Sequence, residues 1–432
     1  MSESTESPET APRAGVKAMA YRYRWVICAL LFAATAINYI DRQTIGVLKP
    51  HLQHEFGWTE TNYGDLVIWF QLAYAISYLF FGRVVDKFGA RTGFAIAISL
   101  WTVAHMAHAA ARTLTGFSIA RVALGIGEAG NFPAGLKAVA EWFPKSERAL
   151  AVGIFNAGAN VGAIITPLIV PVVTLAYGWQ MAFFVTGLFS LAWLVVWLII
   201  YRRPDESKRL NPAELAYIRS DPPDPPGRVS WLKVITKRQC WAYALGKFLI
   251  DPIWWTFLFW LPDFFARRHN LDLHSFGLPL AVVYIVSDCG SVAGGWLSSS
   301  MIKRGRTVNR ARKTAMLISA LAVVPVIGCM YIDNLWLAVG IVGIATAAHQ
   351  SFSCNLYTLP SDLFPRQAVG SVVGIGGMAG GIGGMLMAKF ASVTLEVFDT
   401  YTPVFVVAAT IYLVALGVIH WLTPRYEPAT LD

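Results

Sequence analysis

Apolar segments about twenty residues long recur along the whole of this 432-residue chain, and each is long enough to cross a bilayer core roughly 30 Å thick as a helix. A transmembrane β-strand is about half that length and alternates polar with apolar side chains, which these segments do not. Inside lipid a spanning segment must satisfy its own backbone hydrogen bonds, which leaves helices. The sequence therefore predicts an all-α integral membrane protein.

Composition agrees with this prediction, because 56% of the residues are hydrophobic and only 14% are charged, whereas soluble domains are roughly 25% charged. The net charge of +9 lies in the loops between apolar segments, which is unlike a nucleic-acid-binding surface. We expect twelve transmembrane helices. Their predicted ranges are 25–48, 63–82, 92–111, 114–138, 149–173, 180–201, 240–265, 276–300, 314–332, 335–359, 368–392 and 402–422.

The distribution of Lys and Arg predicts the orientation. Cytoplasmic loops are enriched in these residues. With both termini inside, four of them fall in outside loops (Lys49, Arg112, Arg267 and Arg268), and four fall within spans (Arg42, Arg121, Lys247 and Lys389). The others lie in, or at the edge of, the segments that this topology makes cytoplasmic. Residues 1–20 lack the apolar core of a signal peptide, so we expect the first helix to be an uncleaved insertion signal in the plasma (inner) membrane.

The chain also divides into two similar halves. EWFPKSERALAVGIF at 141–155 resembles DLFPRQAVGSVVGIG at 362–376, and the Pro-rich, charged stretch between them is too polar to fold alone. Parallel repeats of six helices are typical of one large class of secondary transporter, in which the interface between the halves forms a central cavity. The predicted units are an N-terminal tail (1–24), a first six-helix half (25–201), a cytoplasmic linker (202–239), a second half (240–422) and a C-terminal tail (423–432).

The connection between the second and third spans reads GRVVDKFGAR. Its Gly82, Asp86, Lys87, Gly89 and Arg91 resemble the loop motif of the major facilitator superfamily, although Ala90 departs from it. Glycines permit a tight turn and close helix approach, and Asp86 is suited to pair with a cation or cap a helix at a cytoplasmic gate. An ordinary polar turn is the alternative.

Ionisable side chains inside membrane spans are costly and usually face a cavity or a partner. Arg121 and Glu128 lie two turns apart on one helix, roughly 10 Å along its axis, so they do not pair directly. We expect Arg121 to bind an anion and Glu128 to carry a proton, with a structural ion pair between helices as the alternative. Asp41 and Arg42 are adjacent and diverge by about 100°, so one faces the cavity and the other a neighbouring helix.

Lys247 and Asp251 have the four-residue spacing of a helical salt bridge. The functional interpretation gives Lys247 to a substrate carboxylate when Asp251 releases it, and the alternative is a self-contained pair. Aromatic rings stack on sugar faces and amides hydrogen-bond hydroxyls, so other candidates line the predicted cavity. They are Tyr39, Gln71, Tyr74, Trp254, Trp255, Asn355 and Tyr357.

Two motifs point to packing and not to a cofactor. Gly125, Gly127 and Gly130 match a dinucleotide fingerprint, but they lie inside an apolar helix without the preceding strand that such a site needs. Small residues at this spacing let membrane helices approach closely. His105 and His108 lack a third metal ligand, so we expect helix-surface histidines and no metal site.

A narrower resemblance rests on three stretches. NYIDRQTIG (38–46) and ARVALGIGEAGNFPAGLKAVAEWFP (120–144) resemble the anion:cation symporter family of the major facilitator superfamily. LGKFLIDPIWWTFLFWLPDFF (245–265) resembles the hexuronate transporters within it. The resemblance implies that Asp41 is a proton-coupling carboxylate and that Arg42 is an anion-path or gating residue, with a static structural role for either as the alternative. It also implies proton symport of a sugar acid such as glucuronate or galacturonate, without a cofactor.

Several alternatives stay open at this point. Another organic anion, such as an aldonate or an aromatic carboxylate, fits the same cations, and Na⁺ in place of H⁺ is not excluded. A drug exporter of this fold would carry a Gly-Pro pair in the fifth helix, where GIFNAGANVGAIITP stands. An enzyme would show a nucleophile with a base or a metal cluster, and a sensor would carry a long extension. We expect a lipid-embedded transporter that works as a monomer.

Overall fold

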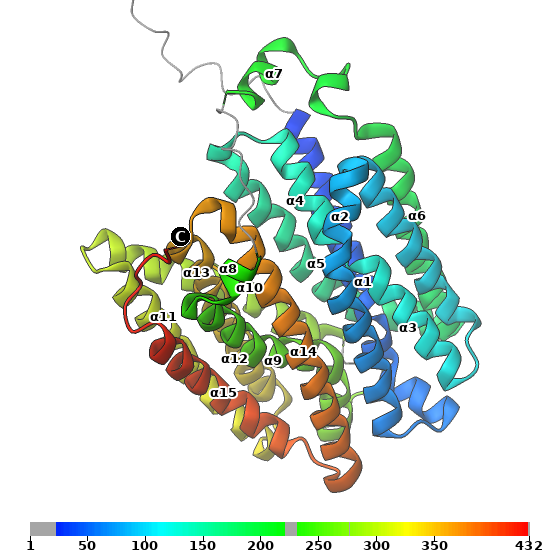
Figure 1. Ribbon diagram of the computed structural model, residues 1–432. Helices are drawn as coiled ribbons and strands as arrows, with labels where there is room; N and C mark the ends of the chain where they lie inside the picture. Colours follow the sequence, from blue (N-terminus) through cyan, green and yellow to red (C-terminus); the bar gives the residue numbers. More distant parts are fainter. Residues whose placement is uncertain (1–22, 221–230, 276, 431–432) are drawn as a thin grey trace, which may run out of the picture.

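The computed structural model describes residues 23–220, 231–275 and 277–430, which form helices joined by short connections, with no strand (Figure 1). This confirms the all-α prediction. The helices of the first part are α1 (Tyr23–Phe56), α2 (Glu60–Ala107), η2 (His108–Ala110), α3 (Leu114–Glu128), α4 (Asn131–Trp142), α5 (Lys145–Tyr177), α6 (Trp179–Ile200), η3 (Pro204–Glu206) and α7 (Pro212–Ile218). The helices of the second part are α8 (Trp231–Ile235), α9 (Arg238–His269), α10 (Gly277–Lys303), α11 (Val308–Val323), η4 (Val324–Tyr331), α12 (Leu335–Leu356), α13 (Leu359–Leu363), α14 (Arg366–Phe398) and α15 (Thr402–Leu422).

Ten segments of the described chain are long and apolar enough to cross a membrane. Two of the twelve predicted spans are not among these ten segments. The span at 63–82 forms the first part of α2, and the span at 114–138 is divided between α3 and α4 by a break at Ala129–Gly130. The apolar, multi-pass character of the chain is thus confirmed, while the total of twelve spans stays a prediction.

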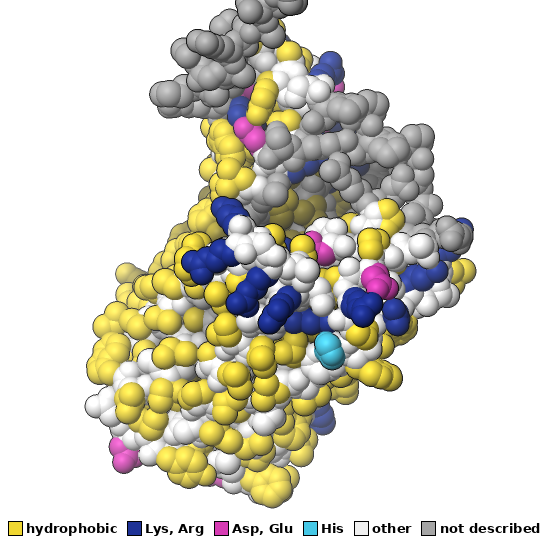
Figure 2. Space-filling view, turned by 90° about the vertical axis from the view of Figure 1, so that its left-hand side faces the viewer, with side chains coloured by type: hydrophobic (Ala, Val, Ile, Leu, Met, Phe, Trp, Pro, Cys, Tyr) yellow, Lys and Arg dark blue, Asp and Glu magenta, His cyan; other side chains and the backbone are white. Residues whose placement is uncertain are grey.

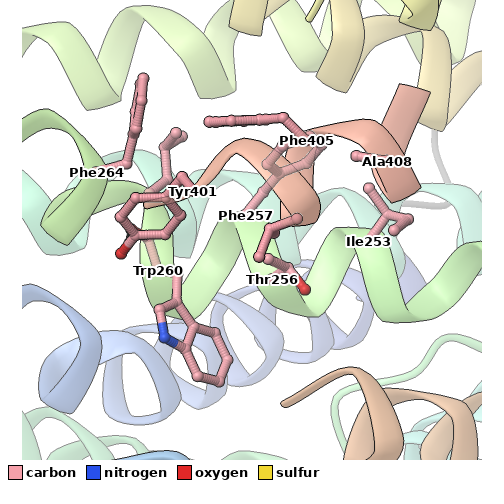
Figure 3. Close-up of a pocket in the computed structure, with 10 residues that line it drawn as sticks. Ile253, Thr256, Phe257, Trp260, Phe264, Tyr401, Phe405 and Ala408 are labelled. Carbon is pink, nitrogen blue, oxygen red and sulfur yellow. Dashed lines mark hydrogen bonds between the residues drawn. The ribbon is translucent and has the colours of Figure 1, made fainter. Parts of the chain in front are cut away.

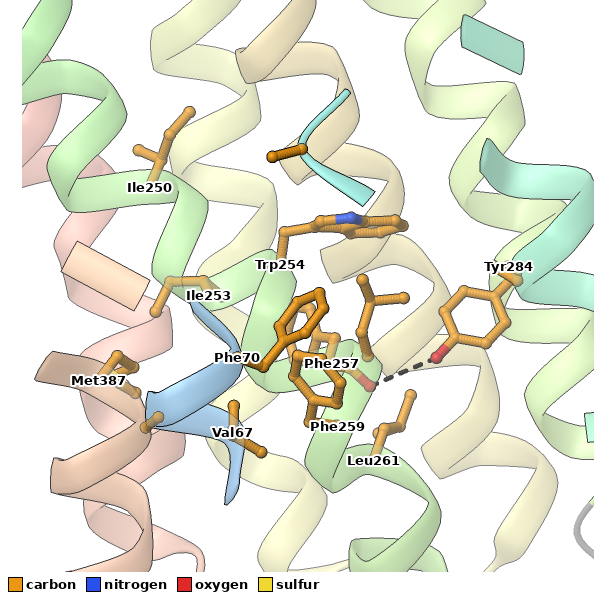
Figure 4. Close-up of a cluster of buried hydrophobic side chains, with 14 of the residues drawn as sticks. Val67, Phe70, Ile250, Ile253, Trp254, Phe257, Phe259, Leu261, Tyr284 and Met387 are labelled. Carbon is orange, nitrogen blue, oxygen red and sulfur yellow. Dashed lines mark hydrogen bonds between the residues drawn. The ribbon is translucent and has the colours of Figure 1, made fainter. Parts of the chain in front are cut away.

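The helices form two bundles that lie side by side, α1–α6 in one and α9–α15 in the other (Figure 1). Between the bundles, α14 packs along α2, α10 packs against α5, and α1 packs against α9. The short helix α7 lies at one end of the molecule, which we call the α7 end. Figure 4 shows part of the apolar contact between the bundles, where Phe70 of α2 lies beside Phe259 of α9, with ring centres 6.4 Å apart.

Close packing within the first bundle depends on the glycines of α3. A methyl group on Gly125 would lie 2.5 Å from the carbonyl oxygen of Phe70, and one on Gly127 would lie 2.5 Å from the backbone nitrogen of Trp101. Both contacts are with the backbone of α2, which cannot easily move aside. The structure confirms that these glycines serve helix packing.

The outer surface has the character expected of a protein in lipid. Val103, Val292 and Trp296 are among many large apolar side chains that are more than two-thirds exposed. Figure 2 shows the face formed by the second bundle, where Lys and Arg side chains form a row towards the α7 end above a broad apolar surface. The end of α10 and the connection to α11 contribute exposed cations such as Lys303 and Arg304.

Candidate functional site

Arg121 of α3 lies at the contact between the two bundles. Its guanidinium stands 4.2 Å from the ring centre of Phe70 in the first bundle and 5.6 Å from that of Phe259 in the second. The residue is only 1% exposed, and its Nε and Nη2 have no hydrogen-bond partner among the described residues. Burying a cation with unsatisfied donors is costly. A ligand that supplies hydrogen-bond acceptors would therefore stabilise this side chain.

Glu128, the last residue of α3, forms an ion pair with Arg42 of α1. Arg42 Nε donates to Glu128 Oε2 at 2.7 Å, and Arg42 Nη2 donates to Asn38 Oδ1 at 3.1 Å. Both partners are almost fully buried. Glu128 Oε1 accepts no hydrogen bond from the described part of the chain. The interhelical ion pair considered from the sequence is therefore present, and Arg42, not Asp41, faces the contact between the bundles.

An aromatic cage surrounds the Arg42 guanidinium. The ring centres of Tyr39, Tyr74 and Trp255 lie 4.8, 4.9 and 4.9 Å from its central carbon, and that of Phe70 lies 5.4 Å away. Trp255 comes from α9, so the cage is completed only when the bundles meet. Three of the predicted cavity residues, Tyr39, Tyr74 and Trp255, are thus brought together around one cation.

Gln71 also lies at the contact between the bundles. Its side chain packs against Gly384 of α14, and a methyl group on that glycine would lie 2.5 Å from Gln71 Oε1. Gln71 is buried, yet neither polar atom of its amide has a hydrogen-bond partner within the described ranges. Its amide and the Arg121 guanidinium are both polar groups left unsatisfied at this interface.

Lys247 and Asp251 form the predicted salt bridge, with Lys247 Nζ 2.6 Å from Asp251 Oδ2. Lys247 also donates to the hydroxyl of Tyr357 at 2.5 Å. The lysine is therefore held by two partners in α9 and at the end of α12. In this conformation Lys247 and Asp251 form the self-contained pair that was the alternative interpretation. Binding of a substrate carboxylate by Lys247 would require Asp251 to move away.

Three predicted residues lie elsewhere. Asn355 is held within the second bundle, where its amide donates to the carbonyls of Ser351 and Gly294. Trp254 stacks on His349, also inside the second bundle. Asp41, one residue before Arg42, faces away from the contact between the bundles. The structure therefore does not bring Asn355, Trp254 or Asp41 together with Arg121.

The expectation of helix-surface histidines is wrong. His105 and His108 are both completely buried between α2 and α6. His105 Nε2 lies 2.7 Å from Thr186 Oγ1 and 3.3 Å from Asp41 Oδ1. A single His in an apolar segment gives no sign of which face is covered, so only the packing of α6 onto α2 reveals this cluster.

The loop motif differs in part from its prediction. Residues 82–91 are helical apart from Gly89, whose φ of +78° makes the bend in α2 and favours glycine. A methyl group on Gly82 would meet no described atom within 4 Å, so close helix approach is not its role here. Arg91 donates to the carbonyls of Leu198 and Tyr201, which places it on the last turn of α6. The Lys87 ammonium stands 5.2 Å from the ring centre of Phe88. The side chain of Asp86 lies outside the described residues.

Sequence reasoning missed a cluster of charges at the end opposite α7, which we call the far-end cluster. Lys49 of α1 lies 2.7 Å from Glu60 Oε2 and 2.8 Å from Asp263 Oδ2 of α9. Arg267 lies 2.9 Å from Asp263 Oδ2 and also contacts Glu60. These contacts join α1 and α2 to α9, and so join the two bundles. Asp263, inside the apolar run FLFWLPDFF, was the available signal, since a carboxylate there requires a partner.

A small pocket between α9 and α15 is apolar and holds none of the predicted site residues (Figure 3). Ile253, Thr256, Phe257 and Phe405 are among its lining residues. The described residues also contain no group of three His, Cys, Asp or Glu side chains that could hold a metal ion. The charged clusters described above therefore lie outside this pocket.

Comparison with known proteins identifies the family to which this architecture belongs. The family model described as Major Facilitator Superfamily matches residues 31–388. The chain belongs to this superfamily. It is 34% identical to the hexuronate transporter of Escherichia coli K12 over 94% of this chain and 95% of that protein. It is 31% identical to the galacturonate transporter of Dickeya chrysanthemi over 77% of this chain and 94% of that one.

Solved structures agree at the level of the fold. A D-xylose-proton symporter superimposes with a TM-score of 0.75 at 14% identity, covering 94% of this chain and 98% of its own. A bacterial homologue of the human lysosomal transporter Spinster gives a TM-score of 0.72 at 18% identity, covering 95% of this chain and 100% of its own. This major facilitator protein is a multi-pass membrane transporter and not an enzyme.

In this transporter the central cluster consists of Arg42, Arg121 and Glu128. Two guanidiniums face one carboxylate, so these three side chains carry a net charge of +1 in their ionised forms. Arg42 is matched by Glu128 through a direct pair, while Arg121 is not. An anion with one negative charge would balance the cluster and satisfy the free guanidinium nitrogens.

Proposed function

We propose that this transporter imports a hydroxylated sugar acid, such as glucuronate or galacturonate, by proton symport through alternating access. The unsatisfied guanidinium of Arg121 at the contact between the bundles carries the proposal. Arg presents a planar pair of donors that matches a carboxylate. The names of the relatives, which include hexuronate, galacturonate and D-galactonate transporters, support the choice of a sugar acid.

The rest of the sugar acid would be bound by the groups beside Arg121. Tyr39, Tyr74 and Trp255 present rings to a pyranose face, and the unsatisfied amide of Gln71 suits a hydroxyl. Lys247 would take part once Asp251 releases it. An apolar anion would leave the Gln71 amide unsatisfied, which favours a hydroxylated substrate.

The burial of both cations supports alternating access. Arg121 is 1% exposed and Arg42 is 1% exposed, so in this conformation a solute in water reaches neither. Because Phe259 and Trp255 from α9 cover them, separation of the bundles would uncover both cations together. We assign the α7 end to the cytoplasm, together with both termini and the 202–239 linker, and the two six-helix halves to the moving bodies of a monomer in the inner membrane. The row of cations at that end supports this orientation.

Coupling would operate through the central cluster. Binding of an anion at Arg121 changes the electrostatic field at Glu128, two turns along the same helix, and protonation of Glu128 in turn changes the field at Arg121. Such reciprocal coupling between two ligands is what symport requires. Protonation of Glu128 would also release Arg42 from its pair.

Uptake of labelled sugar acids into proteoliposomes tests the proposal. We expect glucuronate or galacturonate to accumulate when the outside is acidic, and accumulation to collapse when a protonophore removes the gradient. Galactonate, glucarate and benzoate serve as competitors. Stronger competition by benzoate than by a hexuronate would contradict the sugar-acid assignment. Accumulation driven by a Na⁺ gradient without a pH gradient would contradict proton coupling.

A further inference from the structure

A second buried polar cluster lies inside the first bundle, on the side of α1 that faces away from the central cluster. It joins Asp41 of α1, His105 of α2, and Ser190 and Thr186 of α6, all of them completely buried. Ser190 Oγ donates to Asp41 Oδ2 at 2.7 Å, and Trp101 Nε1 donates to Ser190 Oγ at 3.1 Å. Because the one hydroxyl proton of Ser190 is used in this way, Asp41 Oδ2 is an acceptor.

The neighbours of His105 determine which of its nitrogens carries hydrogen. The hydroxyl of Thr186 donates to the carbonyl of Ala182 at 2.8 Å, so at its 2.7 Å contact with His105 Nε2 it acts as the acceptor. Nε2 therefore bears hydrogen, and Asp41 Oδ1 lies 3.3 Å from it. This leaves two lone-pair positions, Asp41 Oδ1 and His105 Nδ1. Both are buried without a hydrogen-bond partner in the described part of the chain.

The ionisable groups that other elements place around this pair come from η2 and α3. His108, in η2, has its ring centre 6.1 Å from that of His105, and its Nδ1 donates to the carbonyl of Ala104 at 2.9 Å. From α3, Arg121 acts electrostatically on His105, and Glu128 acts on Asp41. Thr186 and Ser190 of α6 do not titrate. Asp41 and His105 therefore contact each other, while the charges of α3 influence them only through space.

We propose that Asp41 and His105 together form one proton-binding site, with His105 as a titrating partner of the carboxylate. A proton from water enters at Asp41 Oδ1 or His105 Nδ1, and the charge of the pair changes from −1 to 0. The summed charge of Asp41, Arg42, Arg121 and Glu128 with neutral His105 is 0, so this step raises it to +1. A monovalent anion is then attracted to Arg121, which links the proton to the substrate.

This inference rests on the proton symport proposed above, but its main test needs no substrate. The infrared band of protonated carboxyl groups is followed against pH in the purified protein in liposomes. The part lost in Asp41→Asn is assigned to Asp41. We expect the midpoint of this titration to move by about one pH unit or more in His105→Gln, because a titrating neighbour that contacts the carboxylate is removed. His108→Gln is the matched control, since His108 is equally buried but does not contact Asp41, and we expect a much smaller movement.

The transport readout uses glucuronate. In His105→Gln we expect accumulation driven by a pH gradient to fall by about tenfold or more, with counterflow exchange kept within about twofold. If His105→Gln does not fold, Thr186→Val replaces it, since it removes the acceptor that holds Nε2–H away from Asp41. An Asp41 band that does not titrate, or that moves equally in both histidine variants, overturns the proposal. Failure of the wild type to take up any sugar acid would instead contradict the proposed function.

Discussion

Two charged clusters join the bundles of this transporter, and they differ in how their charges are matched. In the far-end cluster, Lys49 and Arg267 meet Glu60 and Asp263, and each cation contacts both carboxylates. In the central cluster, Arg42 and Arg121 face Glu128 alone. All three members of the central cluster are buried, as are Lys49, Glu60 and Asp263, whereas about a third of the Arg267 side chain is exposed. The far-end cluster contacts α9 through ion pairs, and the central cluster contacts it through aromatic rings.

This difference separates a structural ion network from a proposed ligand site. A buried ion network whose members are all paired holds two elements in one relative position, and loss of one member leaves a charge uncompensated. A buried cation with free donors is costly until a ligand supplies the missing acceptor. We therefore call the far-end cluster a latch, because its ion pairs join the bundles in this conformation, and we propose the central cluster as the site where an anion binds.

The largest expected effect is at Arg121. In Arg121→Lys the planar donor pair is lost, and one charge-assisted hydrogen bond contributes about 1.5–3 kcal/mol, so we expect hexuronate binding to weaken by at least about tenfold. Binding to the purified protein, beside its thermal unfolding, measures this. Arg267→Lys is the matched control, because it changes the same side chain in the saturated cluster. Equal loss of affinity in both variants would remove the distinction between the clusters.

The next effect concerns Glu128. Glu128→Gln permanently removes the negative charge that Arg42 pairs with, and so imitates the protonated state. We expect accumulation against a gradient to be abolished while counterflow exchange continues, as measured in the same vesicles. Asp41→Asn should resemble it. Uphill uptake by Glu128→Gln driven by the proton gradient would show that Glu128 is not an obligatory coupling group.

A smaller effect is expected when the latch is weakened. Asp263→Asn removes one of the two carboxylates that Lys49 and Arg267 share, so we expect the far end to open more often. Ser392→Cys reports on this end, because Ser392 is buried in α14 against Gly64 of α2. In a background without native cysteines, its labelling by a thiol reagent should become severalfold faster.

A cysteine at Gly374 serves as the control for the latch, since a methyl group there would meet no described atom within 4 Å. Its labelling should not become faster when Asp263 is replaced. Unchanged labelling of Ser392→Cys would mean that apolar packing, and not the ion network, holds the far end together.

The smallest effect is expected in a third charged cluster, at the α7 end and within the first bundle. Glu147 pairs with Arg24 at 2.8 Å, and the hydrogen bond from Arg24 lowers the pKa of this carboxyl below its usual value near 4.5. A lowered pKa stabilises the fold above about pH 4.5, and this stabilisation is lost as the pH falls through the folded-state value. We expect Glu147→Gln to cost about 1 kcal/mol or less at neutral pH, with the difference from wild type shrinking below pH 4.5. The free energy of unfolding of both proteins in detergent, measured across pH, tests this. A difference between them that does not change with pH would assign the effect to packing.

The two ionisable residues of the first span show how far sequence reasoning reaches. Their adjacency predicts that Asp41 and Arg42 point in different directions, and the structure agrees. Which of the two faces the second bundle depends on the rotation of α1 about its own axis, and that rotation is set by packing against α5, α6 and α9. The same reason explains His105 and His108, whose burial depends on a helix more than seventy residues away in the chain.

The loop motif gives a similar lesson. The positions of Gly89 and Arg91 follow from the pattern, and the positive φ of Gly89 could be expected from a tight turn. The hydrogen bonds from Arg91 to the last carbonyls of α6 could not be expected from the sequence, because Arg91 approaches those carbonyls only when α2 and α6 lie side by side. Backbone requirements are local and can be predicted from the sequence, whereas the hydrogen-bond partner of a side chain depends on tertiary contacts.

The sequence by itself determined that this is a helical membrane protein, because apolar length and the requirement for internal backbone hydrogen bonds leave few structures possible in lipid. It also determined which residue types carry the chemistry, since charges are rare inside spans. The tertiary structure alone decided how those charges are matched. Pairing depends on distances of about 3 Å between helices remote in sequence, and these distances placed Arg42 with Glu128, Asp41 with His105, and Lys49 with Asp263, leaving Arg121 with unsatisfied donors.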